Sequence, residues 1–145
     1  MSHFRCLGSD CPNHCCGPYS GISPLLRPLG HVKMSEIILL PQDAEALKAA
    51  GAERFIRQNE NGVMIMDTSP DGTCAALKNG RCEVYDSRPA ICKAYPLYLD
   101  MFAGVCALEE CKAVSSDLRP EDLGDALRNL LDIYQYWIDF YRQKL

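Results

Sequence analysis

The chain has 145 residues, 48% of them apolar, which is enough for one globular domain that buries a core without crosslinks. Its formal charge of −4 provides no basic field for a nucleic-acid backbone, so a nucleic-acid partner is not expected. The N-terminus lacks the apolar run of a signal peptide and no stretch has the length of a membrane span, so we expect a cytoplasmic protein with no membrane partner.

The first predicted segment, residues 4–23, is a loop that carries four cysteines. Gly, Pro, Asn and Ser are frequent in it, so helix and strand signals are weak. Cys6, Cys11, Cys15 and Cys16 follow the spacing C-x4-C-x3-C-C, and the C-x2-C of a usual zinc knuckle is absent from the whole sequence. A bound metal would supply the order that this composition does not.

The next segments are predicted to form scaffold. Residues 34–40 are apolar and partly β-branched, which predicts a strand or an extended approach to a helix. A helix is expected from Pro41 to about Gln58, with a break near Gly51, because proline suits a first helical turn and the apolar residues recur at helical spacing. Residues 63–66 are predicted to form a short strand.

Three further cysteines lie in residues 74–96, around two turn signals. Residues 74–77 and 81–85 flank Lys78-Asn79-Gly80, in which Asn and Gly both tolerate positive φ, so a small hairpin is predicted. The hairpin would bring Cys74 and Cys82 within reach of a shared ion or cluster. Pro89 is suited to the first position of a short helical turn, expected over residues 89–94, which would carry Cys92 inward.

The last predicted elements are a cysteine pair and a long helix. The C-x4-C spacing of Cys106 and Cys111 fits one side of a helical turn or the two ends of a loop. Residues 117–145 begin with an acidic first turn around Pro120 and then show a regular apolar stripe, which predicts a long amphipathic helix. Its aromatic stripe is expected to cover the core of the domain.

The predicted fold class is therefore small α+β: an irregular, cysteine-rich, metal-organised single domain with a short β-hairpin and a long C-terminal amphipathic helix. A reducing compartment favours metal binding over disulfides, so the candidate metal ligands are the cysteines. They are Cys6, Cys11, Cys15, Cys16, Cys74, Cys82, Cys92, Cys106 and Cys111.

Arg88 and Tyr85 are the candidate cofactor-contacting residues. Thiolates around a dication leave net negative charge, which Arg88, Lys93 or Arg81 would balance. The alternative for Arg88 is to cap the hairpin through carboxylate contacts.

Residues 74–96 resemble the YkgJ-type cysteine-cluster family of zinc- or iron-chelating domains. The shared phrase is Gly-x-Cys-x-Val-Tyr-x-x-Arg-Pro-x-x-Cys followed by an aromatic residue and proline, here residues 80–96. The family usually has C-x2-C-x2-C-C at its N-terminus. Residues 4–16 of this chain instead resemble the opening of flagellin lysine-N-methylase, whose members are longer and are linked to an iron–sulfur cluster.

The resemblance implies cysteine ligands at Cys6, Cys11, Cys15, Cys16, Cys74, Cys82 and Cys92, with Cys106 and Cys111 outside its strongest part. The methylase-like N-terminus and the missing C-x2-C favour an iron–sulfur cluster, of the [4Fe–4S] type, with zinc as the close alternative. The predicted function is metal binding through clustered thiolates. The alternative is a metallo-enzyme of the lysine-methylase type or another cluster-dependent redox enzyme, for which the sequence offers no catalytic set.

Overall fold

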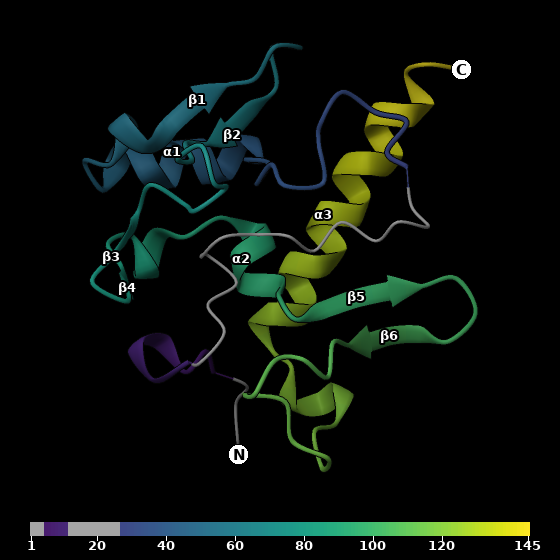
Figure 1. Cartoon of the computed structure of the whole chain (residues 1–145). Helices are drawn as coiled ribbons and strands as arrows, with labels where there is room; N and C mark the ends of the chain where they lie inside the picture. The colour runs from purple at the N-terminus through teal and green to yellow at the C-terminus, as the bar shows by residue number, and fades with distance from the viewer. Residues whose placement is uncertain (1–4, 12–26) are drawn as a thin grey trace. The chain divides into compact units, whose positions relative to one another are not determined.

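The computed structural model of the chain describes residues 5–11 and 27–145, whose contacts separate into two compact units (Figure 1). Unit 1 contains residues 5–11 and Ala90–Leu145, and unit 2 contains residues 27–89 of the described chain. Unit 1 combines helix with one two-stranded antiparallel sheet, and unit 2 combines helix with two such sheets. The predicted α+β class is confirmed.

Unit 2 begins with an extended segment that leads into helix α1, Pro41–Ala49. Residues 34–40 form no strand; a single bridge joins Ile38 to Ile65, so the segment is the extended approach to the helix. The Leu40 N–H donates to Asp43 Oδ2 at 2.9 Å, which caps the first turn. The helix ends before Gly51, whose φ of 72° is the left-handed conformation that glycine tolerates at a helix end.

The part of the predicted helix beyond Gly51 is wrong. The chain instead forms a 3₁₀ turn, Glu53–Phe55, and strand β1, Ile56–Gln58. Strand β1 pairs antiparallel with β2, Met64–Met66, within the predicted strand at residues 63–66. Tertiary pairing with β2 decides the conformation of residues 56–58, which local propensity left ambiguous.

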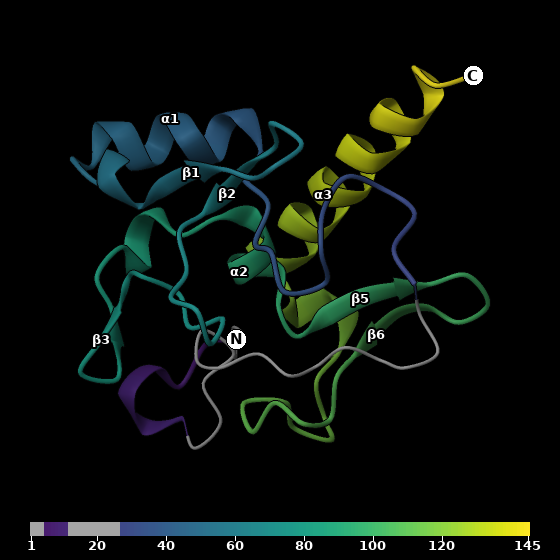
Figure 2. The same cartoon turned by 45° about the horizontal axis from the view of Figure 1, so that its top comes forward.

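The core of unit 2 lies between α1 and the β1–β2 pair, which Figure 2 shows side by side. Its buried members are Leu39, Leu47, Ala52, Phe55, Met66, Cys74, Ala76 and Val84. The predicted hairpin follows, with β3, Leu77–Lys78, paired to β4, Arg81–Cys82. Asn79 and Gly80 have φ of 52° and 73°, the conformation expected for this turn, so the hairpin is confirmed.

Unit 1 is built on the long helix α3, Asp125–Arg142, with helix α2, Ala90–Ala94, and strand β5 packed beside it (Figure 1). The predicted helix started at residue 117, but residues 120–122 form a 3₁₀ turn and Gly124 has φ of 50°, so α3 begins later. Its buried face consists of Ala126, Leu130 and Ile133. The short helical turn predicted at residues 89–94 is confirmed by α2.

Unit 1 also contains a hairpin that the sequence did not predict. Strand β5, Leu97–Asp100, pairs antiparallel with β6, Gly104–Ala107. None of the helices in the described ranges is both long enough and apolar enough to cross a membrane.

Candidate metal centre

Seven of the nine predicted cysteine ligands lie in the described residues; Cys15 and Cys16 lie outside them. The structure distributes the seven over both units. Unit 2 holds Cys74 and Cys82, and unit 1 holds Cys6, Cys11, Cys92, Cys106 and Cys111. No disulfide joins any two of these seven cysteines.

Cys74 is the most buried of these cysteines, with 7% of its surface exposed in the apolar core of unit 2. Burial, the largest effect, raises the pKa of its thiol. The backbone amides of Ala76 and Leu77 oppose this rise. In the turn after Cys74, the Leu77 N–H donates to the Cys74 carbonyl at 3.0 Å.

Cys82 lies in β4, opposite Leu77 of β3. Its negative charge, when ionised, also raises the pKa of Cys74, so the hairpin brings the two sulfurs into electrostatic contact. A bound cation would reverse this repulsion, because two neighbouring thiolates attract the same metal ion.

The Cys6 sulfur is hydrogen-bonded to the backbone of a short turn. It accepts a hydrogen bond from the Gly8 N–H, two residues later, at 3.4 Å. Gly8, with φ of 60°, opens the 3₁₀ turn Gly8–Asp10, and the Cys11 N–H closes it on the Gly8 carbonyl at 3.1 Å. Amide donors of this kind stabilise a sulfur in its thiolate form.

The remaining cysteines of unit 1 lie on three elements. Cys92 is in α2 and Cys106 is in β6, while Cys111 follows a turn in which its N–H donates to the Leu108 carbonyl at 3.1 Å. Of the two arrangements predicted for Cys106 and Cys111, the structure shows the loop and not the helical turn. All three cysteines are half-buried.

Sequence reasoning missed Tyr98, which contacts a candidate ligand. Tyr98 of β5 is directly opposite Cys106 of β6, and the Cys106 side chain raises the pKa of the Tyr98 phenol. The alternation of side chains in residues 97–100 was the available signal, since it is typical of a strand.

Arg88 and Tyr85 contact each other within unit 2. The guanidinium carbon lies 3.8 Å from the centre of the Tyr85 ring, and Nη1 donates to the Tyr85 carbonyl at 2.6 Å. In the described residues no carboxylate pairs with Arg88, so the predicted carboxylate cap is not the arrangement observed. The pair fixes the turn that leads into Pro89.

Thiolates are soft ligands suited to zinc and iron, and the amide–sulfur bond at Cys6 and the Cys74–Cys82 pair are compatible with sulfur ligands. Within residues 5–11 and 27–145, no group of three or more Cys, His, Asp or Glu side chains is arranged to hold a metal ion. The fit therefore rests on the donor chemistry of the individual cysteines.

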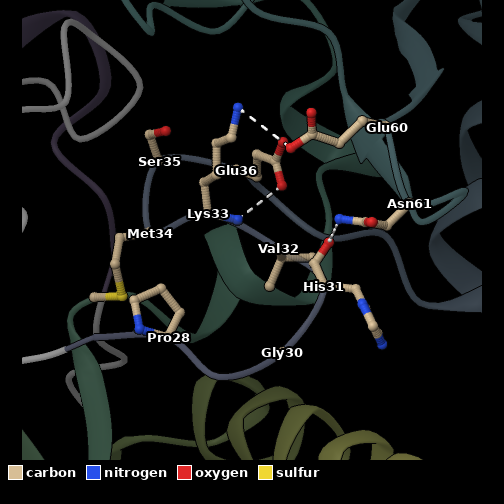
Figure 3. Close-up of a pocket in the computed structure, with 10 residues that line it drawn as sticks. All are labelled: Pro28, Gly30, His31, Val32, Lys33, Met34, Ser35, Glu36, Glu60 and Asn61. Atoms are coloured by element: carbon tan, nitrogen blue, oxygen red, sulfur yellow. Dashed lines mark hydrogen bonds and ion pairs between the residues drawn. The ribbon is translucent and has the colours of Figure 1, made fainter.

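A cavity of about 400 Å³ lies elsewhere in unit 2, along residues 28–36 and beside Glu60 and Asn61 (Figure 3). Lys33 Nζ is 3.6 Å from Glu60 Oε1, and the Lys33 N–H donates to Glu36 Oε2 at 2.9 Å. Its ten lining residues include no cysteine, so the cavity is separate from the thiols.

Comparison with known proteins gives one match. Searches of curated proteins and of solved structures found no significant match. The resemblance to flagellin lysine-N-methylase thus stays a prediction. A family model, CxxCxxCC, described as "Putative zinc- or iron-chelating domain", matches residues 5–116. This range includes all nine cysteines and covers most of the sequence, and the chain therefore belongs to the CxxCxxCC family.

Proposed function

We propose that this protein binds zinc or iron through its cysteine thiolates. Family membership gives the class of metal, and the nine cysteines give the donors. We further propose that the chain acts as one metal-binding domain in the cytoplasm. One family model that includes residues of both units supports the single domain, and the reducing chemistry of that compartment suits thiolate ligands.

The observation that carries the proposal is the surrounding of the Cys74 sulfur. A buried cysteine that only fills space packs as a small neutral hydrophobe and needs no second sulfur beside it. Cys82 packs against the core cluster that contains Cys74, and its charge raises the pKa of the Cys74 thiol. Two neighbouring thiols of this kind can share a cation, which removes the repulsion between their thiolates.

The test compares two substitutions in the same core. Cys74→Ser nearly keeps the size of the side chain but replaces the soft ligand, while Val84→Ala, at a position that is also 7% exposed, only removes packing. Each protein would be purified without oxygen and its metal content determined by elemental analysis. We expect Cys74→Ser to lose most of its metal and Val84→Ala to keep it; equal metal contents in the two variants would refute the role of Cys74.

The ligand set we propose is the full cysteine group. Its best supported members are Cys6, whose sulfur accepts an amide hydrogen bond, and Cys74, which has Cys82 beside it. Arg88 and Tyr85 are proposed to lie near the metal as charge-balancing and contact residues. Arg88→Ala should then lower metal retention more than it lowers helix content. The opposite ranking would assign the Arg88–Tyr85 pair to folding alone.

We propose an iron–sulfur cluster, of the [4Fe–4S] type, as the first choice of metal group, and zinc as the alternative. The absence of C-x2-C and the tolerance of cluster ligation for irregular cysteine spacing support this order. Anaerobic protein should then be brown and contain equal amounts of iron and inorganic sulfide. Colourless protein that holds stoichiometric zinc would reverse the order. The enzymatic alternative rests on the methylase resemblance alone.

A further inference from the structure

Helix α3 carries a second apolar face besides the one that packs into unit 1. The packed face ends at Ile133, and of the described residues 134–142 none is buried. This part of the helix continues past α2 and the β5–β6 hairpin toward the C-terminus (Figures 1 and 2). The exposed large apolar side chains of α3 are those of Leu131, Ile138 and Tyr141, at 50%, 43% and 45%.

The spacing of these three residues is that of a coiled-coil seam. Ile138 follows Leu131 by seven residues and Tyr141 follows Ile138 by three, as a and d positions do. At 3.6 residues per turn, the row lies about 100° around the helix from the packed face. We call this row the α3 seam. So narrow a row is typical of a face that packs on another helix, whereas a helix that lies on a membrane has a broad apolar face.

Two cations border the α3 seam at its C-terminal end. Arg142 is exposed, and in the part of the chain that the structure describes no carboxylate pairs with it. Lys144 lies in the final turn, where its N–H donates to the Tyr141 carbonyl at 3.0 Å and its Nζ is 5.2 Å from the centre of the Phe140 ring. Cations near a helix C-terminus stabilise the helix dipole, but that effect does not require an apolar row beside them.

A second copy of this chain is a poor occupant of the α3 seam. In a two-fold pair both copies use the same surface, so an antiparallel arrangement brings each flank of the seam against the same flank of the other copy. The flank away from the packed face carries Arg128, Gln135 and Arg142, each seven residues after the last, and none is acidic. Parallel pairing would instead bring the two cation-bearing C-terminal ends together. In both cases the charges of the two copies do not complement each other.

We propose that the α3 seam is the docking surface for an amphipathic helix of another protein, whose own apolar seam is flanked by acidic residues. Leu131, Ile138 and Tyr141 would pack on the apolar side chains of that helix, and Arg142 and Lys144 would pair with its carboxylates. The formal charge of the whole chain, −4, disfavours an anionic lipid surface, so the local cations and the narrow seam together favour a helix. This inference is independent of metal binding.

The probes are two synthetic helical peptides that share leucine at their a and d positions and differ only at the flanking positions. One has glutamate there and the other has lysine. Binding of each labelled peptide to the whole chain is measured by fluorescence anisotropy at low ionic strength. We expect the glutamate peptide to bind about tenfold more tightly than the lysine peptide, and high salt to reduce this difference.

Three variants at exposed positions locate the binding. Arg142→Glu should abolish the preference for glutamate, and Ile138→Asp should weaken the binding of the glutamate peptide by about tenfold or more. Met101→Asp is the matched control and should bind as wild type does, because Met101 is a 91% exposed apolar residue of the same unit but lies in the turn between β5 and β6. Circular dichroism checks that each variant keeps the helix content of wild type.

Four outcomes would overturn the proposal. Two are equal affinities of wild type for the two peptides and a glutamate preference that survives in Arg142→Glu. The third is a wild-type dimer in sedimentation equilibrium that Ile138→Asp dissociates, which would assign the α3 seam to a second copy. The fourth is binding to phosphatidylserine vesicles but to neither peptide, which would assign it to a membrane surface.

Discussion

Replacing Tyr134 by Phe isolates one contact between α3 and the β5–β6 hairpin. The Tyr134 hydroxyl forms two hydrogen bonds with the backbone of Leu99, 35 residues away along the chain. Leu99 directs its N–H and C=O away from β6, because the neighbouring positions face the partner strand. The hydroxyl thus takes the place that a further strand would have at this edge.

The expected loss of stability follows from these two bonds. Each neutral hydrogen bond contributes about 1 kcal/mol net, and removal of the hydroxyl abolishes both. Leu99 is half-buried, so water reaches part of its backbone and reduces the penalty for the unpaired groups. We therefore expect Tyr134→Phe to lower the free energy of unfolding by about 1.5 kcal/mol.

The assay is denaturant unfolding of the metal-free protein followed by circular dichroism, together with amide hydrogen exchange at Leu99. Tyr136→Phe is the control, since Tyr136 is on the same helix and its contacts are with the rings of Trp137 and Phe140. Its effect should stay within about 0.5 kcal/mol. The reasoning fails if both variants lose the same stability, or if exchange at Leu99 is not faster in Tyr134→Phe.

Three further predictions concern unit 2. The raised pKa of Cys74 stabilises the metal-free protein below the ordinary thiol value of 9.0, and this contribution is lost as pH rises above it. Unfolding free energies measured across this range should fall more steeply in wild type than in Cys74→Ala, and parallel curves would contradict this. The pKa of Asp71 is lowered to about 2, and the largest cause is the hydrogen bond that the Ser69 hydroxyl donates to its carboxylate at 2.6 Å. An NMR titration of Asp71 should give a midpoint near that value, and Ser69→Ala should move the midpoint toward 3.8. The Asn59 side chain is 8% exposed; its amide donates to the His31 carbonyl and to Glu36, and its Oδ1 accepts the N–H groups of Asn61 and Val63. Asn59→Ala should therefore lower the free energy of unfolding, measured by heat or denaturant, by about 3 kcal/mol. The exposed Asn61→Ala should lower it by less than about 1 kcal/mol.

Local chemistry explains which elements could be predicted from sequence. Asn79-Gly80 requires positive φ and gave the β3–β4 hairpin, and the proline before α2 gave its helical turn. The apolar stripe of α3 identified a long helix, but a glycine at residue 124 moved its start. At the hairpin turn, before α2 and at the start of α3, a single residue type restricts the backbone, whereas the length of α3 follows from a periodic pattern.

The β5–β6 hairpin was not predicted because the residues of its turn are not typical of a turn. Met101 and Phe102 are 91% and 94% exposed, at positions where polar residues are usual. The turn forms because the Asp100 carboxylate accepts two backbone N–H groups and Gly104 has φ of 77°. Without that hairpin, the pairing of Tyr98 with Cys106 could not be predicted either.

The cysteine spacing predicts which atoms would bind metal but not what surrounds each sulfur. At Cys6 the neighbour of the sulfur is a backbone amide, which no side-chain substitution removes directly. At Cys74 the neighbour is the Cys82 side chain, which a single substitution changes. A mutational scan would therefore detect the surroundings of Cys74 and miss the amide at Cys6, because a side-chain substitution leaves a backbone donor in place.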